Sequence, residues 1–188
     1  MREFDPQLWK ERAWARYCRA INSGRPDNEV GLEWAQDVLA IGALTSLVEW
    51  CKEKKLKVFF AKKQNGAYHS ARREVHISSR LSLKNQVVVL LHECGHHLIG
   101  VNESHDRFGM GYPQSDPEVT KTFHHRVACL EEEMEAWYRG WRLANRLGIS
   151  VDRESFDAMR LKCIRSYIKW TLKPSSFQDI SNEEQPNS

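Results

Sequence analysis

A glutamate and two histidines four residues apart lie inside an apolar stretch of this chain, and this combination restricts the fold more than any other sequence feature. The stretch VVVLLHECGHHLIG, residues 87–100, is too long for a strand and apolar on nearly all sides up to His92, which predicts a buried helix. It contains the pattern H-E-x-x-H from His92 to His96. Residues four apart share one face of a helix, so both imidazoles can bind one metal ion. Buried ionisable groups would be costly without such a partner.

Glu93 lies about 100° round the helix from His92. From there its carboxylate reaches a water on the metal rather than the metal itself, which is the place of a general base. We therefore predict His92 and His96 as zinc ligands and Glu93 as the catalytic base. The alternative is two core histidines bonded to backbone groups, with Glu93 exposed. A catalytic zinc ion takes three protein ligands, so another ligand must follow.

The third ligand is expected downstream, where the candidates are His105, His124, His125, Glu131, Glu132, Glu133 and Glu135. Seven apolar residues at spacings of four and three predict the buried stripe of a long helix: Phe123, Val127, Leu130, Met134, Trp137, Trp141 and Ala144. Glu133 then lies near one edge of the stripe, beside the small residues Ala136 and Gly140, which would allow a close approach to the histidine helix. We predict Glu133 as the third ligand, with Glu131 in reserve. Glu132 and Glu135 are predicted to face solvent.

These residues resemble a known family. H-E-x-x-H followed by a glutamate on a later helix is similar to the gluzincin arrangement, and E-x-E-A-W from Glu133 to Trp137 resembles the E-x-E-A-N signature of ImmA/IrrE-type metallopeptidases. Those are cytoplasmic zincin domains common in bacteria, phages and mobile elements. The resemblance covers roughly residues 56–147. It implies a zincin-like fold, Zn²⁺ as cofactor, a protein or peptide substrate and Glu133 as ligand.

The chain departs from the ImmA/IrrE-type signature at one position and also resembles a second family. Trp137 replaces the small polar residue of the signature, so a hydrogen bond from that position to a zinc ligand would have to come from elsewhere. A weaker similarity to SprT-like proteases implies instead a histidine as third ligand, for which His105 follows His96 closely.

The rest of the chain predicts one α+β domain, mostly helical, with a small mixed sheet. Apolar spacing and turn residues predict helices at Pro6–Ile21, Leu32–Lys54, Leu83–Ile99, Glu118–Leu147 and from Asp152 or Ser155 to Trp170, and strands at Leu56–Ala61 and Val75–Ser78. In zincins the strand before the active-site helix lies at the edge of the sheet, where a peptide can pair with it. We expect residues 1–173 to form the zincin-like domain with its N-terminal helices, and residues 174–188 a flexible polar tail.

Composition favours a cytoplasmic location and allows a second function, the binding of nucleic acid or protein. No apolar run reaches the roughly 18 residues that span a bilayer, and MREFDPQLWKER has no secretory apolar core. The cysteines are five in number and scattered, which favours a reducing cytoplasm. The segment from Lys52 to Arg73 contains eight basic residues and only one acidic residue, Glu53. This predicts a solvated face, or else the contact surface of a zincin-fold module that binds nucleic acid or protein in a regulatory or anti-restriction role.

Overall fold

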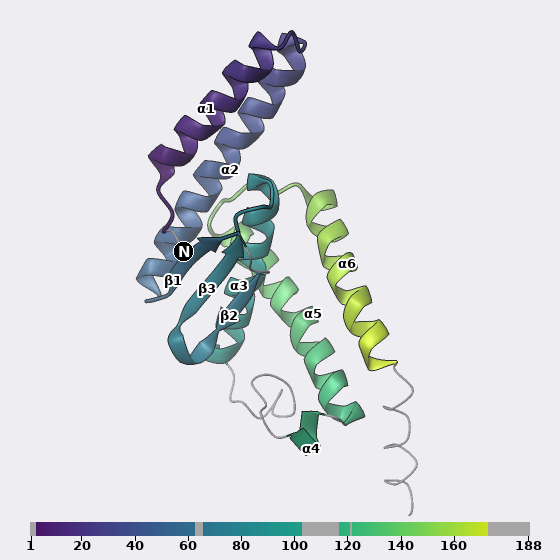
Figure 1. The fold of residues 1–188 in the computed structure, drawn as a ribbon. Helices are drawn as coiled ribbons and strands as arrows, with labels where there is room; N and C mark the ends of the chain where they lie inside the picture. The colour runs from purple at the N-terminus through teal and green to yellow at the C-terminus, as the bar shows by residue number, and fades with distance from the viewer. Residues whose placement is uncertain (1–2, 63–65, 103–116, 121, 173–188) are drawn as a thin grey trace, which may run out of the picture.

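The computed structural model in Figure 1 describes residues 3–62, 66–102, 117–120 and 122–172. The predicted tail, residues 174–188, lies outside these residues. The described part is a mostly helical α+β fold, as predicted. Its elements are α1 (Pro6–Asn22), α2 (Asp27–Glu53), β1 (Lys57–Ala61), β2 (Ala67–His69), the 3₁₀ turn η1 (Ser70–Arg72), β3 (Glu74–Ser78), α3 (Leu83–Asn102), α4 (Pro117–Thr120), α5 (Phe123–Arg146) and α6 (Arg153–Thr171).

The three described strands form one mixed sheet with the order β1-β3-β2. β1 pairs in parallel with β3, and β2 pairs antiparallel with it, with Tyr68 opposite Val75. The predicted edge position of Val75–Ser78 is therefore wrong, because β3 has a neighbour on each side. The edge beside it belongs to β2, whose three residues are too few to show an alternating pattern in the sequence.

One face of the sheet packs on α3. Val75 and Ile77 of β3 are fully buried there, together with Val88 and Leu91 of α3. Helices α2 and α5 also pack on α3, which accounts for the apolar character of α3 on nearly all sides. Ser82 caps the start of this helix, because its hydroxyl oxygen accepts a hydrogen bond from the Asn85 amide at 3.3 Å.

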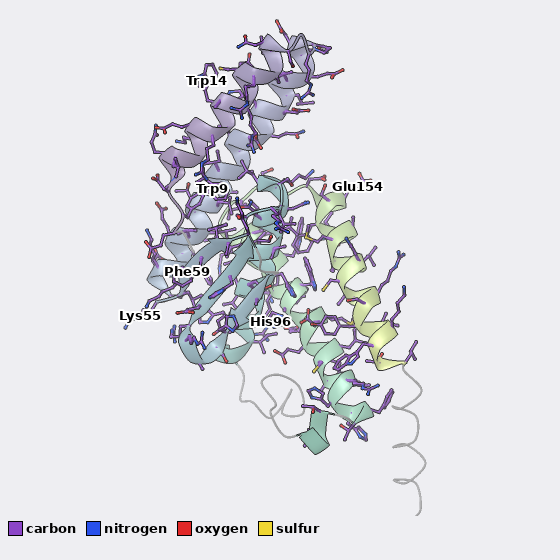
Figure 2. The ribbon with its side chains drawn as sticks, viewed as in Figure 1. Trp9, Trp14, Lys55, Phe59, His96 and Glu154 are labelled. Atoms are coloured by element: carbon purple, nitrogen blue, oxygen red, sulfur yellow. The ribbon has the colours of Figure 1, made fainter. Side chains whose placement is uncertain are left out.

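Helices α1 and α2 form a hairpin whose outer end stands away from the sheet (Figure 1). α2 begins at Asp27 rather than at the predicted Leu32. Trp9 near the start of α1 packs edge-on against Phe60 of β1, with ring centroids 5.2 Å apart, and Figure 2 shows Trp14 further out along the hairpin. Of the helices in the described part of the chain, none is both long and apolar enough to cross a membrane.

Helices α3 and α5 approach each other so closely that small residues are required at their contact. A Cβ atom on Gly140 of α5 would lie 2.5 Å from the carbonyl oxygen of Leu91, and one on Gly95 of α3 would overlap the carbonyl of Ala136. The close approach predicted from Ala136 and Gly140 is therefore confirmed. It turns residue 133 of α5 toward α3.

The buried face of α5 differs from the predicted apolar stripe. Met134 is 52% exposed, and Phe123, Val127, Leu130 and Trp141 are only half-buried, whereas Glu132 and Glu133 are buried at 6% and 4% exposure. Trp137 and Ala144 are buried as predicted. The contact through Ala136 and Gly140 fixes the rotation of α5 about its axis. Met134, on the opposite side of the predicted stripe from these small residues, therefore turns toward solvent.

The helix contact predicts opposite effects for two glycine substitutions. Gly95→Ala should destabilise the fold by about 1–3 kcal/mol, because the new methyl group meets backbone that cannot turn aside. Gly42→Ala in α2 is the control, since a Cβ there meets nothing within 4 Å. It should stabilise the fold by roughly 0.5–1 kcal/mol through helix propensity. Urea unfolding measures both, and equal shifts for the two variants would contradict the close contact.

Candidate metal centre

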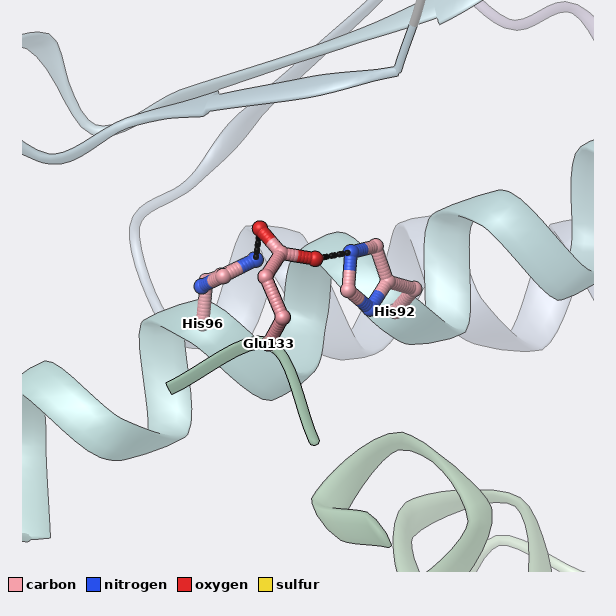
Figure 3. Close-up of side chains that lie close together, drawn as sticks. All are labelled: His92, His96 and Glu133. Carbon is pink, nitrogen blue, oxygen red and sulfur yellow. Dashed lines mark ion pairs between the residues drawn. The ribbon is translucent and has the colours of Figure 1, made fainter. Parts of the chain in front are cut away.

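Two imidazoles from α3 and one carboxylate from α5 meet between the helices (Figure 3). Nε2 of His92 lies 3.2 Å from Oε2 of Glu133, and Nε2 of His96 lies 3.4 Å from Oε1. One ligand atom from each of the three residues lies within 4.8 Å of the others. With bonds of about 2.0 Å, the ligand atoms of a tetrahedral zinc ion lie about 3.3 Å apart. The spacing and the donor types therefore fit a three-ligand zinc site.

The charges of these groups depend on one another. Burial opposes the ionised carboxylate of Glu133, but hydrogen bonds from His92 and His96 outweigh it and hold its pKa well below the usual range. Burial also opposes the charged form of His96, yet its hydrogen bonds to Glu132 and Glu133 raise its pKa to about 10. The carboxylates thus favour a positive charge on His96. A metal ion would supply that charge and release the proton, so its binding should strengthen as the pH rises.

Glu93 lies beside this cluster without belonging to it. It is 5% exposed, so the alternative in which it faces solvent is wrong. Gly66, which precedes β2, packs directly against the carboxylate of Glu93, since a Cβ atom on Gly66 would lie 2.7 Å from Oε1 of Glu93. Burial raises the pKa of Glu93, while the nearby His92 and His96 and a hydrogen bond from the Tyr68 backbone amide lower it. A buried carboxylate with a raised pKa is suited to hold and pass on a proton.

Glu132 has a structural role that the sequence did not predict. Its Oε1 lies 3.4 Å from Nδ1 of His96, whose Nε2 faces Glu133. A carboxylate on the far nitrogen of a ligating histidine fixes the ring and its tautomer. The prediction that Glu132 faces solvent is wrong, because the rotation of α5 brings it against α3. If Ala136 and Gly140 are taken as the centre of the buried face of α5, Glu132 falls on that face, because it lies one helical turn before Ala136.

Helix α6 supplies further contacts that sequence analysis missed. The hydroxyl of Tyr167 donates to Oε1 of Glu133 at 2.8 Å, and Sγ of Cys163 lies 3.9 Å from Oε2. Trp137 stacks on His92 with ring centroids 4.2 Å apart, and Phe156 of α6 packs edge-on against Trp137. The spacing of four between Cys163 and Tyr167 was the available signal, but it does not by itself point to a site.

The other predicted candidates do not join the cluster. His105 lies outside the described residues. His124 is exposed, and His125 is buried with an imidazole nitrogen 3.5 Å from Sγ of Cys129. Within the described residues, the group that could hold a metal ion consists of His92, His96 and Glu133.

Two more predicted candidates have other surroundings. Glu131 is exposed, and Glu135 forms an ion pair with Arg139 at 2.7 Å. Cys94, which lies between the two histidines of α3, packs in the core with its sulfur 3.6 Å from that of Cys51.

Comparison of the chain with protein-family models, with curated proteins and with solved structures found no match. The similarity to ImmA/IrrE-type metallopeptidases therefore rests on the motifs from His92 to His96 and from Glu133 to Trp137. The metal centre itself rests on the distances, burial and charges of its side chains.

Glu132 and Glu131 offer a matched pair of variants for this centre. Each replacement by alanine removes one negative charge from the same turn of α5, but only Glu132 contacts a ligand. Glu132→Ala should lower zinc affinity by about 10–100-fold. Glu131→Ala should leave zinc affinity within a few-fold. Competition with a chromophoric chelator measures both, and equal affinities would show that Glu132 does not support His96.

Proposed function

We propose that the protein is a zinc-dependent peptidase of the gluzincin type, in which His92, His96 and Glu133 hold Zn²⁺. The observation that carries the proposal is the convergence of one donor atom from each of these residues, all within 4.8 Å of one another, beside Glu93, a buried carboxylate outside the ligand set. Zinc held by three protein ligands polarises a carbonyl group and lowers the pKa of water to about 7. The same residues support the ImmA/IrrE-type assignment.

Glu93 is the proposed general base. Its carboxylate takes a proton from the attacking water and passes it to the leaving amine. The Tyr68 backbone amide donates to this carboxylate, which holds it in place beside the ligands. Burial raises the pKa of Glu93, which favours the protonated form that must exist before the proton passes to the amine nitrogen.

A peptide or protein substrate is favoured by the position of β2. Gly66 and the backbone of Tyr68, at the start of this strand, both lie against Glu93. Among the described strands, β2 pairs only with β3, which leaves its other edge as a place where an extended peptide could form backbone hydrogen bonds. A peptide bound there would run past the proposed base. β2 therefore takes the role that the sequence analysis assigned to the strand at Val75–Ser78.

We assign the proposed peptidase to the cytoplasm. All five cysteines are free, and Cys51 and Cys94 remain thiols although their sulfur atoms lie 3.6 Å apart. Free thiols at this distance are typical of a reducing compartment.

A second candidate function is binding to nucleic acid. Arg73 donates hydrogen bonds to the backbone carbonyls of Lys54 and Lys55, so the end of α2 and the end of η1 lie together. Figure 2 shows Lys55 at this end of the sheet. The exposed basic residues gathered there are Lys52, Lys54, Lys55, Lys57, Arg72 and Arg73. Binding of a DNA duplex that weakens steeply with added salt, in a protein without hydrolytic activity, would favour this function.

The peptidase function predicts a separation of metal binding from catalysis. Glu93→Gln should keep zinc and the fold, since the amide has nearly the same shape, but lose roughly 10²–10⁴-fold in rate because it cannot take up the proton. Hydrolysis of a complex peptide mixture, followed by mass spectrometry of the new N-termini, measures the loss. Wild-type cleavage by this variant would contradict the role of Glu93. A variant that cleaves nothing yet keeps the full biological effect would favour the binding function.

A further inference from the structure

We propose that α6 completes the metal centre from outside and that Tyr167 is a positioning residue for Glu133. This inference rests on the proposed zinc site and adds to it a helix that lies outside the segment resembling ImmA/IrrE-type peptidases. The role of Tyr167 would be to determine which carboxylate oxygen of Glu133 is available to bind the metal ion.

The carboxylate of Glu133 has a different pair of neighbours at each oxygen. Oε1 accepts the hydrogen bond from the hydroxyl of Tyr167 at 2.8 Å and lies 3.4 Å from Nε2 of His96. Oε2 lies 3.2 Å from Nε2 of His92 and 3.9 Å from Sγ of Cys163. A phenol is a strong donor at such a distance, whereas a thiol is a weak one. The hydrogen bond therefore holds Oε1 more firmly than Oε2.

The position of α6 is itself fixed by packing around the same site. Phe156 is 2% exposed and packs against Trp137 with ring centroids 5.3 Å apart. Trp137 in turn stacks on His92. Near the other end of α6, the ring of Trp170 lies edge-on to that of His125, at 6.0 Å. One helix thus supports two ligands, His92 through Trp137 and Glu133 through Tyr167.

This arrangement has a consequence for coordination. With Oε1 engaged by Tyr167, Glu133 would offer a metal ion mainly Oε2, which would keep a coordination position available for water or substrate. Without the phenol hydroxyl, both oxygens are free to bind the metal, and the open position would be filled. Tyr167 therefore acts on the reaction through Glu133 and does not need to touch the substrate.

Cobalt binding to the full chain tests this role independently of hydrolysis. Tyr167→Phe keeps the aromatic ring and removes only the hydroxyl, and the unfolding midpoint of the metal-free protein checks that it folds. We expect its Co²⁺ affinity to fall by about 10–100-fold. Its visible absorption should also weaken, because five-coordinate Co²⁺ absorbs less strongly than four-coordinate Co²⁺. Cys163→Ala, which removes only the weak donor, is the matched control and should resemble the wild type in both measurements.

The outcomes separate this inference from the proposed function. Wild-type affinity and absorption in Tyr167→Phe would overturn the positioning role, and if hydrolysis were lost all the same, the hydroxyl would act on the substrate. An equal fall in Cys163→Ala would also overturn it, because the effect would then come from packing of α6. Failure of the wild-type protein to bind Co²⁺ would instead count against the zinc site on which the inference rests.

Discussion

The contact between α3 and α5 is the constraint on which the proposed site depends. Gly95 and Gly140 allow the two helix backbones to touch, and this distance is short enough for Glu133 to reach both His92 and His96. Side chains of ordinary size at these positions would separate the helices, and the three donors would no longer fit the ligand sphere of one ion. The same contact fixes the rotation of α5 and so selects one carboxylate among several for the site.

A charge imbalance accompanies this packing. Three carboxylates are buried around the two imidazoles: those of Glu93, Glu132 and Glu133. Burying ionised groups is costly unless they are paired with opposite charges. The structure shows one response, because the pKa of His96 is raised to about 10. A divalent cation at the same place would offset much of this negative charge, which supports the proposal of a metal ion in this cluster.

The sequence predicted which three residues, His92, His96 and Glu133, come together better than it predicted the packing around them. H-E-x-x-H needs only the period of a helix, and Ala136 and Gly140 marked the side of α5 that carries Glu133. The apolar stripe misled at Met134, because backbone contact at small residues outweighs the burial of a flexible side chain. Glu132 was misplaced for the same reason. Tyr167 could not be found from the sequence, since its contact with Glu133 joins two helices that are 34 residues apart in sequence at this point.

The zinc content of the purified protein tests the central claim most directly. The protein is stripped with a chelator, equilibrated with zinc, desalted and submitted to elemental analysis, beside Glu133→Ala and the exposed-site control Glu131→Ala. The account predicts about one zinc ion per chain in the wild type and in Glu131→Ala, and a strong loss in Glu133→Ala. A wild-type protein without zinc, or a Glu133→Ala variant that keeps its full zinc content, would contradict it.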